Sequence, residues 1–321
     1  MKKKRKIIID CDPGIDDAIA LAYAAANPDD FDILAITTVS GNNTIDVVTR
    51  NALDLTEFYQ MDVPVAKGMA EPLVGEARHA EHYHGKNGLG DCIIPHSTRE
   101  PVEENAVFYL KNILMDLPEH EKATLVCLAP LTNIAILIKV FPEVKEKIQE
   151  ILFMGGAFST GNVTPSAEFN IYADPEAAKI VFKSGIPLTM CGLDVTQKCT
   201  LKRSQILKLC QSKNKIATFA GDMAGHTLEN TSEKYRGQIS VHDVVPIMYM
   251  IHPEYFKFTE TILDVDCSDG VSRGRTICDF RWWNFEEGQD RDLVLTDADS
   301  DKFQQCLIEA LFELGDMLQE K

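Results

Sequence analysis

Cationic side chains are scarce in this chain of 321 residues, where 32 Lys and Arg stand against 49 Asp and Glu. The formal net charge of −17 argues against nucleic acid or an anionic membrane as a partner, because binding phosphates requires a basic face. Long apolar runs are also missing, since no stretch approaches the ~20 apolar residues of a membrane span. The basic start, MKKKRK, is followed by only three isoleucines before Asp10, so we expect a solvated tail and not a signal peptide.

Cysteine pairs with metal-binding or redox spacing are lacking as well. The nine cysteines are spread singly, without CxxC spacing, and an odd number cannot all pair. This pattern predicts reduced thiols, most of them filling the core, and a cytoplasmic location.

Short β-branched apolar runs alternate with amphipathic segments through the first two thirds of the chain. This rhythm is typical of βαβ units and predicts an α/β fold with an open, mainly parallel, twisted, Rossmann-like sheet covered by helices on both faces. The expected strands are KIIID, FDILAITTV, VPVAKG, ATLVCLA, EILFMGG and PLTMCGL, and the expected helices cover 16–26, 44–59, 103–117, 131–140 and 174–184. Because no linker, repeat or low-complexity tract interrupts the chain, we expect one domain over residues 1–321.

The last third of the chain has a different pattern. Helices are expected at 202–231, 243–252 and 300–319, and strands near 256–265, 272–279 and 291–296. The stretch GVSRGRTICD predicts a hairpin or strand pair, which would form a small antiparallel addition at a sheet edge. Two polar segments, 69–102 and 155–170, are too long to be simple connections, and loops of that length in an α/β domain usually carry function.

Four aspartates, Asp10, Asp12, Asp16 and Asp17, crowd into the stretch DCDPGIDD, between the strand KIII and a helix expected to begin near Asp16. In an open parallel sheet, ligands bind outside the carboxyl ends of the strands, which is where this stretch lies. Helix capping explains one or two of these aspartates but not four. Carboxylates packed together repel one another unless a cation compensates, so the cluster predicts a hard divalent ion such as Ca²⁺ or Mg²⁺.

Two other interpretations of the cluster are weaker. An EF-hand loop would need a glycine where Ile15 stands and a glutamate where Leu21 stands. An aspartyl phosphatase, with Asp10 as the nucleophile and Asp12 as the acid, would need a phosphate-pairing lysine and would leave the other two aspartates without a role.

The stretch DCDPGIDDAIAL resembles the DxDPGxDDAxAL signature of the nucleoside hydrolases, the inosine–uridine-preferring type of N-ribohydrolase. The similarity continues in the family's order from residue 6 to about 250. It is carried by the blocks TTVSGNNT, RNAL, HGKNGLG, APLTNIA, ILFMGGAFSTGNVTPSAEFNIYADPEAA, MCGLDVT and VHD. A lone DxD would be a weak signal, whereas this series is very specific.

By this resemblance, Asp12, Asp17, Asp243 and the backbone carbonyl of Leu128 would bind Ca²⁺, and ribose hydroxyls and a water would complete the shell. This donor set suits Ca²⁺, which takes about six to eight oxygens, and it leaves positions open for substrate and nucleophile. Asp12 would also be the general base on the calcium-bound water. Asp10 resembles a supporting position behind these ligands.

A further group of residues resembles the family's sugar-binding positions. Asp16, Asn42, Asn162, Glu168 and Asn170 match positions that hydrogen-bond the ribose hydroxyls, and Met154 matches one that packs against the sugar. Without the resemblance, Asn42 and Asn162 are equally well explained as turn residues, and Met154 as a core side chain at a strand end.

The resemblance implies hydrolysis of the N-glycosidic bond of a ribonucleoside through an oxocarbenium-like ribosyl cation, with inversion at the sugar carbon. His242 matches the position of the family's leaving-group acid, and a histidine can donate a proton near neutral pH. His84 resembles a histidine on the base side, with His82 and Tyr83 as neighbours that could take its place.

Substrate preference is less well defined, because 214–241 matches no subgroup of the family; Tyr235, Arg236 and Gln238 are only candidates for contact with the base. The presence of His242 favours a broad or pyrimidine-tolerant enzyme. Family members are commonly oligomers, which implies a homodimer or homotetramer. Two alternatives stay open: the aspartyl phosphatase, and a non-catalytic protein that binds nucleosides or ribose.

Overall fold

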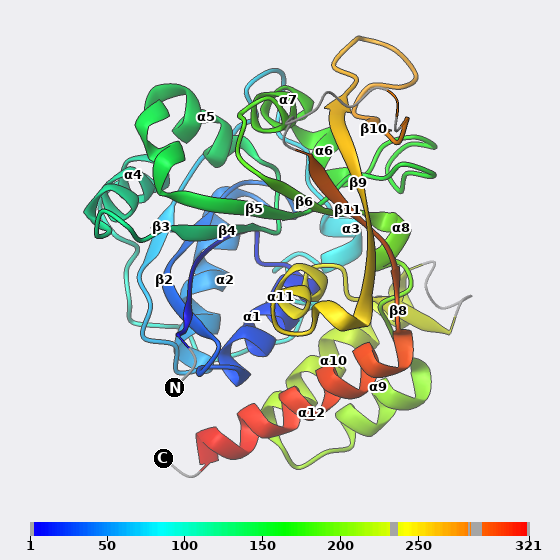
Figure 1. Ribbon diagram of the computed structural model, residues 1–321. Helices are drawn as coiled ribbons and strands as arrows, with labels where there is room; N and C mark the ends of the chain where they lie inside the picture. Colours follow the sequence, from blue (N-terminus) through cyan, green and yellow to red (C-terminus); the bar gives the residue numbers. More distant parts are fainter. Residues whose placement is uncertain (1–2, 232–236, 282, 284–290, 320–321) are drawn as a thin grey trace.

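A nine-stranded sheet runs through the protein and carries helices on both faces (Figure 1). The computed structural model describes residues 3–231, 237–281, 283 and 291–319. In spatial order the strands are β10 (Thr276–Asp279), β9 (Phe256–Val265), β11 (Asp292–Ala298), β6 (Leu188–Cys191), β5 (Ile148–Met154), β4 (Ala123–Cys127), β1 (Arg5–Cys11), β2 (Phe31–Thr38) and β3 (Val65–Lys67). A separate antiparallel pair joins β7 (Thr200–Lys202) and β8 (Gln238–Ser240).

The helices fall between these strands in the chain. They are α1 (Ile15–Ala26), α2 (Ile45–Phe58), α3 (Glu81–His84), α4 (Ala106–Asp116), α5 (Thr132–Val140), α6 (Phe169–Ala173), α7 (Pro175–Phe182), α8 (Leu193–Thr196), α9 (Arg203–Cys210), α10 (Lys215–Asn230), α11 (Val244–Ile251) and α12 (Ser300–Gln319), with short 3-10 turns at Pro142–Lys147 and Pro253–Tyr255. The strands from β11 to β3 pair in parallel, while β9 runs antiparallel to both β10 and β11. The expected α/β class, with an antiparallel edge and helices on both faces, is therefore confirmed.

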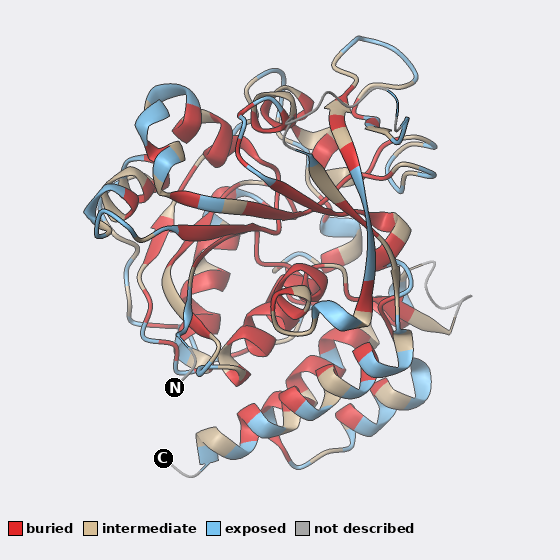
Figure 2. Cartoon of the chain, viewed as in Figure 1, coloured by how far each residue is buried: buried red, intermediate tan, exposed pale blue. Residues whose placement is uncertain are grey.

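The central strands divide the core into two layers. In β1, Ile7 and Ile9 pack into the core layer that contains α1, α10, α11 and α12, whereas Ile8 packs into the layer that contains α4, α5 and α7. Successive side chains of a strand point to opposite faces, so a run of three isoleucines fits a strand that is buried on both sides. Figure 2 shows the middle of the sheet buried in this way.

The order of the strands determines where a ligand can bind. From β1 the chain continues outward through β2 and β3, whereas β4, β5 and β6 extend to the other side of β1. The direction of winding reverses between β1 and β4, and ligands of open α/β sheets bind at such a switch point, outside the carboxyl ends of the strands. The stretch DCDPGIDD begins with the last two residues of β1 and runs into α1, and Leu128 directly follows β4, so both lie at this position.

The last third of the chain differs in detail from the sequence-based prediction. The helix expected over 202–231 is two helices, α9 and α10, which pack against each other and are separated by Gln211–Asn214. The strand expected over 272–279 begins only at Thr276, because the preceding residues form the turn of the β9–β10 hairpin. That hairpin does lie at the sheet edge, as GVSRGRTICD predicted.

No helix in the described part of the chain is long and apolar enough to cross a membrane. The nine cysteines are all free thiols in the structure, and Cys11, Cys127, Cys191 and Cys199 are buried. One domain over residues 1–321 stays a prediction.

Asn214 connects two helices of the outer layer, and its replacement by alanine tests that connection. Its Oδ1 accepts hydrogen bonds from the N–H groups of Ile216 and Ala217 at 3.1 Å, and its Nδ2 donates to the carbonyl of Phe312 at 2.8 Å. We expect Asn214→Ala to lower the free energy of unfolding by about 2–3 kcal/mol in urea denaturation, because the cap of α10 and the hydrogen bond to α12 are both lost.

Asn105 offers a matched control, because it caps α4 through one bond, from the N–H of Val107 at 3.0 Å. We expect Asn105→Ala to cost only about 1 kcal/mol. Equal losses in the two variants would contradict the connecting role of Asn214.

Candidate functional site

The turn after β1 brings the aspartates of DCDPGIDD round the start of α1. Gly14 precedes the helix, and a β-carbon there would lie 2.6 Å from Nδ1 of His84 and 2.7 Å from Nδ2 of Asn42. Such distances are too short for carbon, so only glycine lets these two side chains approach the helix N-terminus so closely. A glycine at position 14 is therefore needed for His84 and Asn42 to take their places in the site.

Asp12 and Asp17 form one hydrogen-bonded unit with Asn42. Asp17 accepts hydrogen bonds from the N–H groups of Asp12 (3.2 Å) and Gly14 (3.0 Å). Asp17 therefore caps α1, as expected for one or two of these aspartates. Asn42 donates its backbone N–H to Oδ2 of Asp12 at 2.6 Å, and its side-chain amide to Oδ1 of Asp12 at 3.1 Å and Oδ2 of Asp17 at 3.0 Å. Asn42, which follows β2, thus holds the carboxylates of Asp12 and Asp17 together.

Three carboxylates converge closely enough to share a cation. Oxygen atoms of Asp16, Asp17 and Asp243 all lie within 4.8 Å of one another. The resemblance had grouped Asp12, not Asp16, with Asp17 and Asp243, so the third carboxylate within this distance in the structure is a different one.

Burial and repulsion oppose ionisation throughout this cluster. Burial is the main cause that raises the pKa of Asp16 to about 7 and that of Asp17 to about 6, and Asp17 raises the pKa of Asp16 further. The pKa values of Asp12 and Asp243 are raised well above their usual range, first by burial and then by neighbouring carboxylates. A bound cation would reverse this effect, because it favours the charged forms.

These residues fit a hard divalent cation. Their donors are carboxylate oxygens, and none of the described residues that line the adjoining cavity is a lysine or arginine that could balance the charge. Leu128, whose carbonyl is the fourth ligand implied by the resemblance, also lines the cavity, and this carbonyl oxygen accepts a hydrogen bond of 3.0 Å from Nδ2 of Asn170. Oxygen-only donors of this kind suit Ca²⁺ or Mg²⁺.

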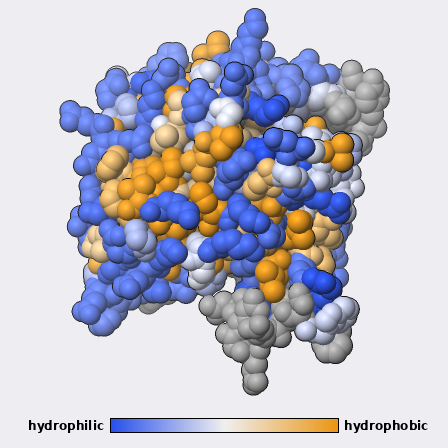
Figure 3. Space-filling view, turned by 90° about the horizontal axis from the view of Figure 1, so that it is seen from above, coloured by the Kyte–Doolittle hydropathy of each residue, from blue (hydrophilic) through white to orange (hydrophobic). Residues whose placement is uncertain are grey.

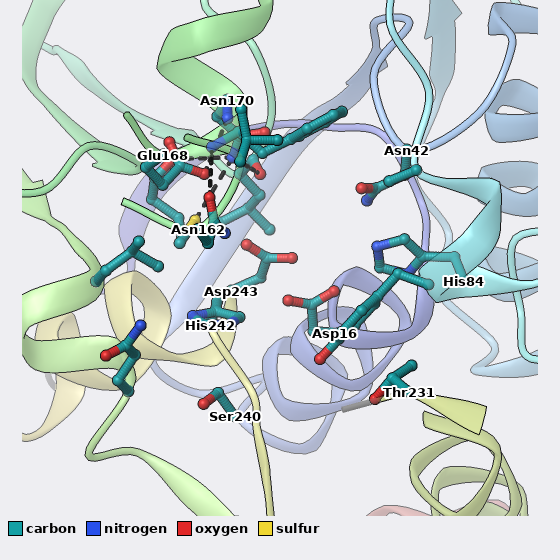
Figure 4. A pocket seen from close by; sticks show the side chains of 18 of the residues that line it. Asp16, Asn42, His84, Asn162, Glu168, Asn170, Thr231, Ser240, His242 and Asp243 are labelled. Carbon is teal, nitrogen blue, oxygen red and sulfur yellow. Dashed lines mark hydrogen bonds between the residues drawn. The ribbon is translucent and has the colours of Figure 1, made fainter. Parts of the chain in front are cut away.

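A cavity of about 380 Å³ opens above the carboxylates. Of the residues predicted from the sequence, ten line it: Asp16, Asn42, His84, Leu128, Met154, Asn162, Glu168, Asn170, His242 and Asp243. Figure 4 shows Asn42 and His84 on one side, Asn162, Glu168 and Asn170 on the other, and Asp16 and Asp243 between them. The remaining two, Asp12 and Asp17, are fully buried and do not line the cavity. Both accept hydrogen bonds from the side chain of Asn42, which does line it.

One wall of the cavity is built by the segment that follows β5. Glu168 accepts hydrogen bonds from the N–H groups of Gly156 (2.8 Å), Asn170 (2.9 Å) and Ile171 (3.1 Å), and it caps α6. Asn162 closes the same loop by accepting from the N–H of Phe169 at 3.0 Å. Burial raises the pKa of Glu168 to about 6 despite these bonds.

Two histidines of the cavity are held by their Nδ1 atoms. The backbone N–H of Ile15 donates to Nδ1 of His84 at 3.1 Å, which assigns the ring proton of the neutral form to Nε2. Burial lowers the pKa of His84 to about 3, so this side chain is a neutral hydrogen-bond donor at physiological pH. Nδ1 of His242 lies 2.7 Å from the hydroxyl of Thr196, which fixes the orientation of that ring.

Supporting residues that the sequence did not single out come from distant parts of the chain. Asn133, at the start of α5, donates to Oδ1 of Asp10 (2.8 Å) and to the carbonyl of Thr38 (3.0 Å), and it accepts from the N–H of Met69 (3.0 Å). Thr37 also donates to Oδ1 of Asp10. Asp10 does not line the cavity; it ties β1 to its neighbours, in keeping with a supporting position.

The described part of the chain adds ten residues to the cavity lining: Ala80, His82, Tyr83, Val163, Phe169, Leu193, Gln197, Asn230, Thr231 and Ser240. His82 and Tyr83 had been named as neighbours of His84, whereas Gln197 and Ser240 carried no signal in the sequence beyond lying next to MCGLDVT and VHD. Of the candidates for contact with the base, Gln238 pairs with Lys202 in the β7–β8 ladder, accepts a side-chain hydrogen bond from Thr200 and does not line the cavity, and Tyr235 and Arg236 lie outside the described residues.

Known proteins are similar to this chain over most of its length. The family model described as inosine-uridine preferring nucleoside hydrolase matches residues 7–305. The pyrimidine-specific ribonucleoside hydrolase RihB of Escherichia coli is 41% identical over 278 residues, which are 86% of this chain and 88% of that protein.

Two solved structures are similar over nearly the whole fold. The plant nucleoside hydrolase PpNRh1 matches with a TM-score of 0.89 and 32% identity, over 97% of this chain and 99% of that one. The purine-preferring ribonucleoside hydrolase from Gardnerella vaginalis matches with a TM-score of 0.89 and 30% identity, over 98% and 100% of the two chains. This chain therefore belongs to the inosine-uridine preferring nucleoside hydrolase family, whose members are enzymes.

Proposed function

We propose that the protein is a calcium-dependent ribonucleoside hydrolase, which cleaves the N-glycosidic bond and releases a free base and ribose. The observation that carries this proposal is the meeting of buried carboxylates with a wall of amides and a carboxylate in one cavity. A sugar with several hydroxyl groups needs many donors and acceptors, and a cation site among them explains why so much negative charge is buried.

Asp12, Asp17, Asp243 and the carbonyl of Leu128 would hold the ion, as the family resemblance implies. When bound, Ca²⁺ would acidify the attacking water and neutralise the carboxylates. Asp16 would then accept a hydrogen bond from a ribose hydroxyl, since its oxygens lie beside those of Asp17 and Asp243.

Side chains of the protein would carry out the proton transfers of the reaction. Asp12 would take the proton of the attacking water, and Asn42 holds both of its oxygens in place. His242 would donate a proton to the departing base through Nε2, since Thr196 engages Nδ1. One carboxylate acting as base, with no second one acting as nucleophile, fits inversion at C1′.

The substrate preference we propose is broad or pyrimidine-tolerant. The relative with 41% identity is named a pyrimidine-specific enzyme, whereas the purine-preferring structure is 30% identical. His84 would add a fixed donor on the base side through its Nε2–H, because the N–H of Ile15 occupies Nδ1.

The phosphatase alternative fits the structure poorly. Its nucleophile would be Asp10, which is 1% exposed and already accepts bonds from Thr37 and Asn133. The described residues that line the cavity also include no lysine to pair with a phosphate.

A homodimer or homotetramer and a cytoplasmic location stay predictions. Figure 3 shows apolar side chains gathered across the middle of one face of the molecule, with hydrophilic side chains around them. Contiguous apolar surface of this kind is typical of sites where protein chains associate.

A panel of nucleosides tests the proposed function. Base release from uridine, cytidine, inosine and adenosine is followed by absorbance, with and without a calcium chelator. We expect release from at least the two pyrimidine nucleosides, its loss with the chelator, and its recovery when Ca²⁺ is added back. Calcium-bound protein that binds a nucleoside but releases no base from any of the four would identify a non-catalytic binding protein instead.

Asparagine variants separate the metal ligands from the sugar ligand. Asp12→Asn is expected to weaken Ca²⁺ binding in calorimetry by roughly 100-fold, and to lower kcat by roughly 10²–10⁴-fold because the general base is lost as well. Asp16→Asn is the matched control: it should bind Ca²⁺ within a few-fold of the unaltered protein while raising KM. If Asp16→Asn lost Ca²⁺ and Asp12→Asn retained it, the assignment of ligands would be reversed.

A further inference from the structure

Ser240 presents a buried hydroxyl group that has no hydrogen-bond partner within the described part of the chain. Among the described residues, the buried side-chain oxygen and nitrogen atoms without a hydrogen-bond partner are Oδ2 of Asp10, Oγ of Ser240 and Oγ1 of Thr276. Only Ser240 of these three residues lines the cavity, and it is 4% exposed. An unpaired buried hydroxyl is unfavourable by itself, so one that borders a ligand cavity points to a partner on the ligand.

The backbone places Ser240 next to the proposed leaving-group acid. Ser240 is the last residue of β8, and His242 follows two positions later. His242 lies in the turn that leads from β8 to α11, and both residues line the cavity. In Figure 4, Ser240 lies beyond His242, on the side away from Glu168 and Asn170.

We propose that the hydroxyl of Ser240 recognises the base by hydrogen-bonding the exocyclic group at C4 of a pyrimidine. This inference rests on the proposed function, which places ribose among Asp16, Asn42, Glu168 and Asn170. A base attached to that sugar extends past His242, and the C4 position is the part of a pyrimidine ring farthest from the glycosidic bond. Ser240 lies in that direction.

The chemistry of a hydroxyl group explains why one residue serves two bases. Uracil carries a carbonyl at C4, which accepts a hydrogen bond, and cytosine carries an amino group there, which donates one. A serine hydroxyl can donate to the first and accept from the second by rotating. Ser240 therefore favours pyrimidines that are substituted at C4 without choosing between them, in line with a pyrimidine-tolerant enzyme.

Three ligands and two variants of Ser240 test the proposal. Uridine and cytidine carry the C4 group, whereas the riboside of 2-pyrimidinone lacks it; kcat/KM is measured for the first two, and the inhibition constant against uridine cleavage for the third. We expect Ser240→Ala to lower kcat/KM for uridine and cytidine by roughly 10-fold or more, because each loses a partner in a desolvated pocket. The inhibition constant of the analogue should change by less than about two-fold. Ser240→Thr keeps a hydroxyl and should retain most of the activity.

Thr276→Val is the matched control, because it removes the other unpaired buried hydroxyl, which lies outside the cavity, and keeps the shape of the side chain. It should leave all three constants within about two-fold. Equal changes for the three ligands in Ser240→Ala, or no change for uridine and cytidine, would overturn the role of Ser240 and leave the hydrolase activity standing. Base release by the unaltered protein from purine nucleosides alone would likewise overturn the role of Ser240, whereas no base release from any of the four nucleosides would overturn the proposed function itself.

Discussion

The mutual repulsion of buried carboxylates at the start of α1 is the constraint on which the rest of the site depends. Asp12, Asp16, Asp17 and Asp243 are all buried, and each has a raised pKa in the absence of a cation. A fold keeps such a cluster only when something compensates its charge. Backbone N–H groups and the amide of Asn42 compensate part of this negative charge, and the proposed calcium ion would neutralise the remainder.

The surrounding structure positions these groups from several strands. The winding of the sheet reverses between β1 and β4, which sets the turn of DCDPGIDD beside Leu128, and Asn133 ties β1 to the end of β2. The segment after β5 contributes Glu168 and Asn170 from the opposite side. Binding of the sugar and binding of the ion are therefore parts of one polar network, and a change in one should affect the other.

Much of this arrangement could be predicted from the sequence, because local patterns determine it. The run of isoleucines in β1 and the motif that follows it place the site, and ten of the twelve predicted residues line one cavity. The break between α9 and α10 and the β7–β8 pair could not be predicted, since Asn214 is held by the distant α12. The convergence of Asp16 with Asp243 and the unpaired hydroxyl of Ser240 depend on distances between segments far apart in the chain, which no spacing in the sequence reveals.

A crystal structure of the protein grown with Ca²⁺, with anomalous diffraction used to locate the ion, tests the central claim most directly. We predict one anomalous peak at the carboxyl end of β1, within about 2.3–2.6 Å of oxygens of Asp12, Asp17 and Asp243 and of the carbonyl of Leu128. No peak at this position, or a peak bound by Asp16 in place of Asp12, would contradict the account.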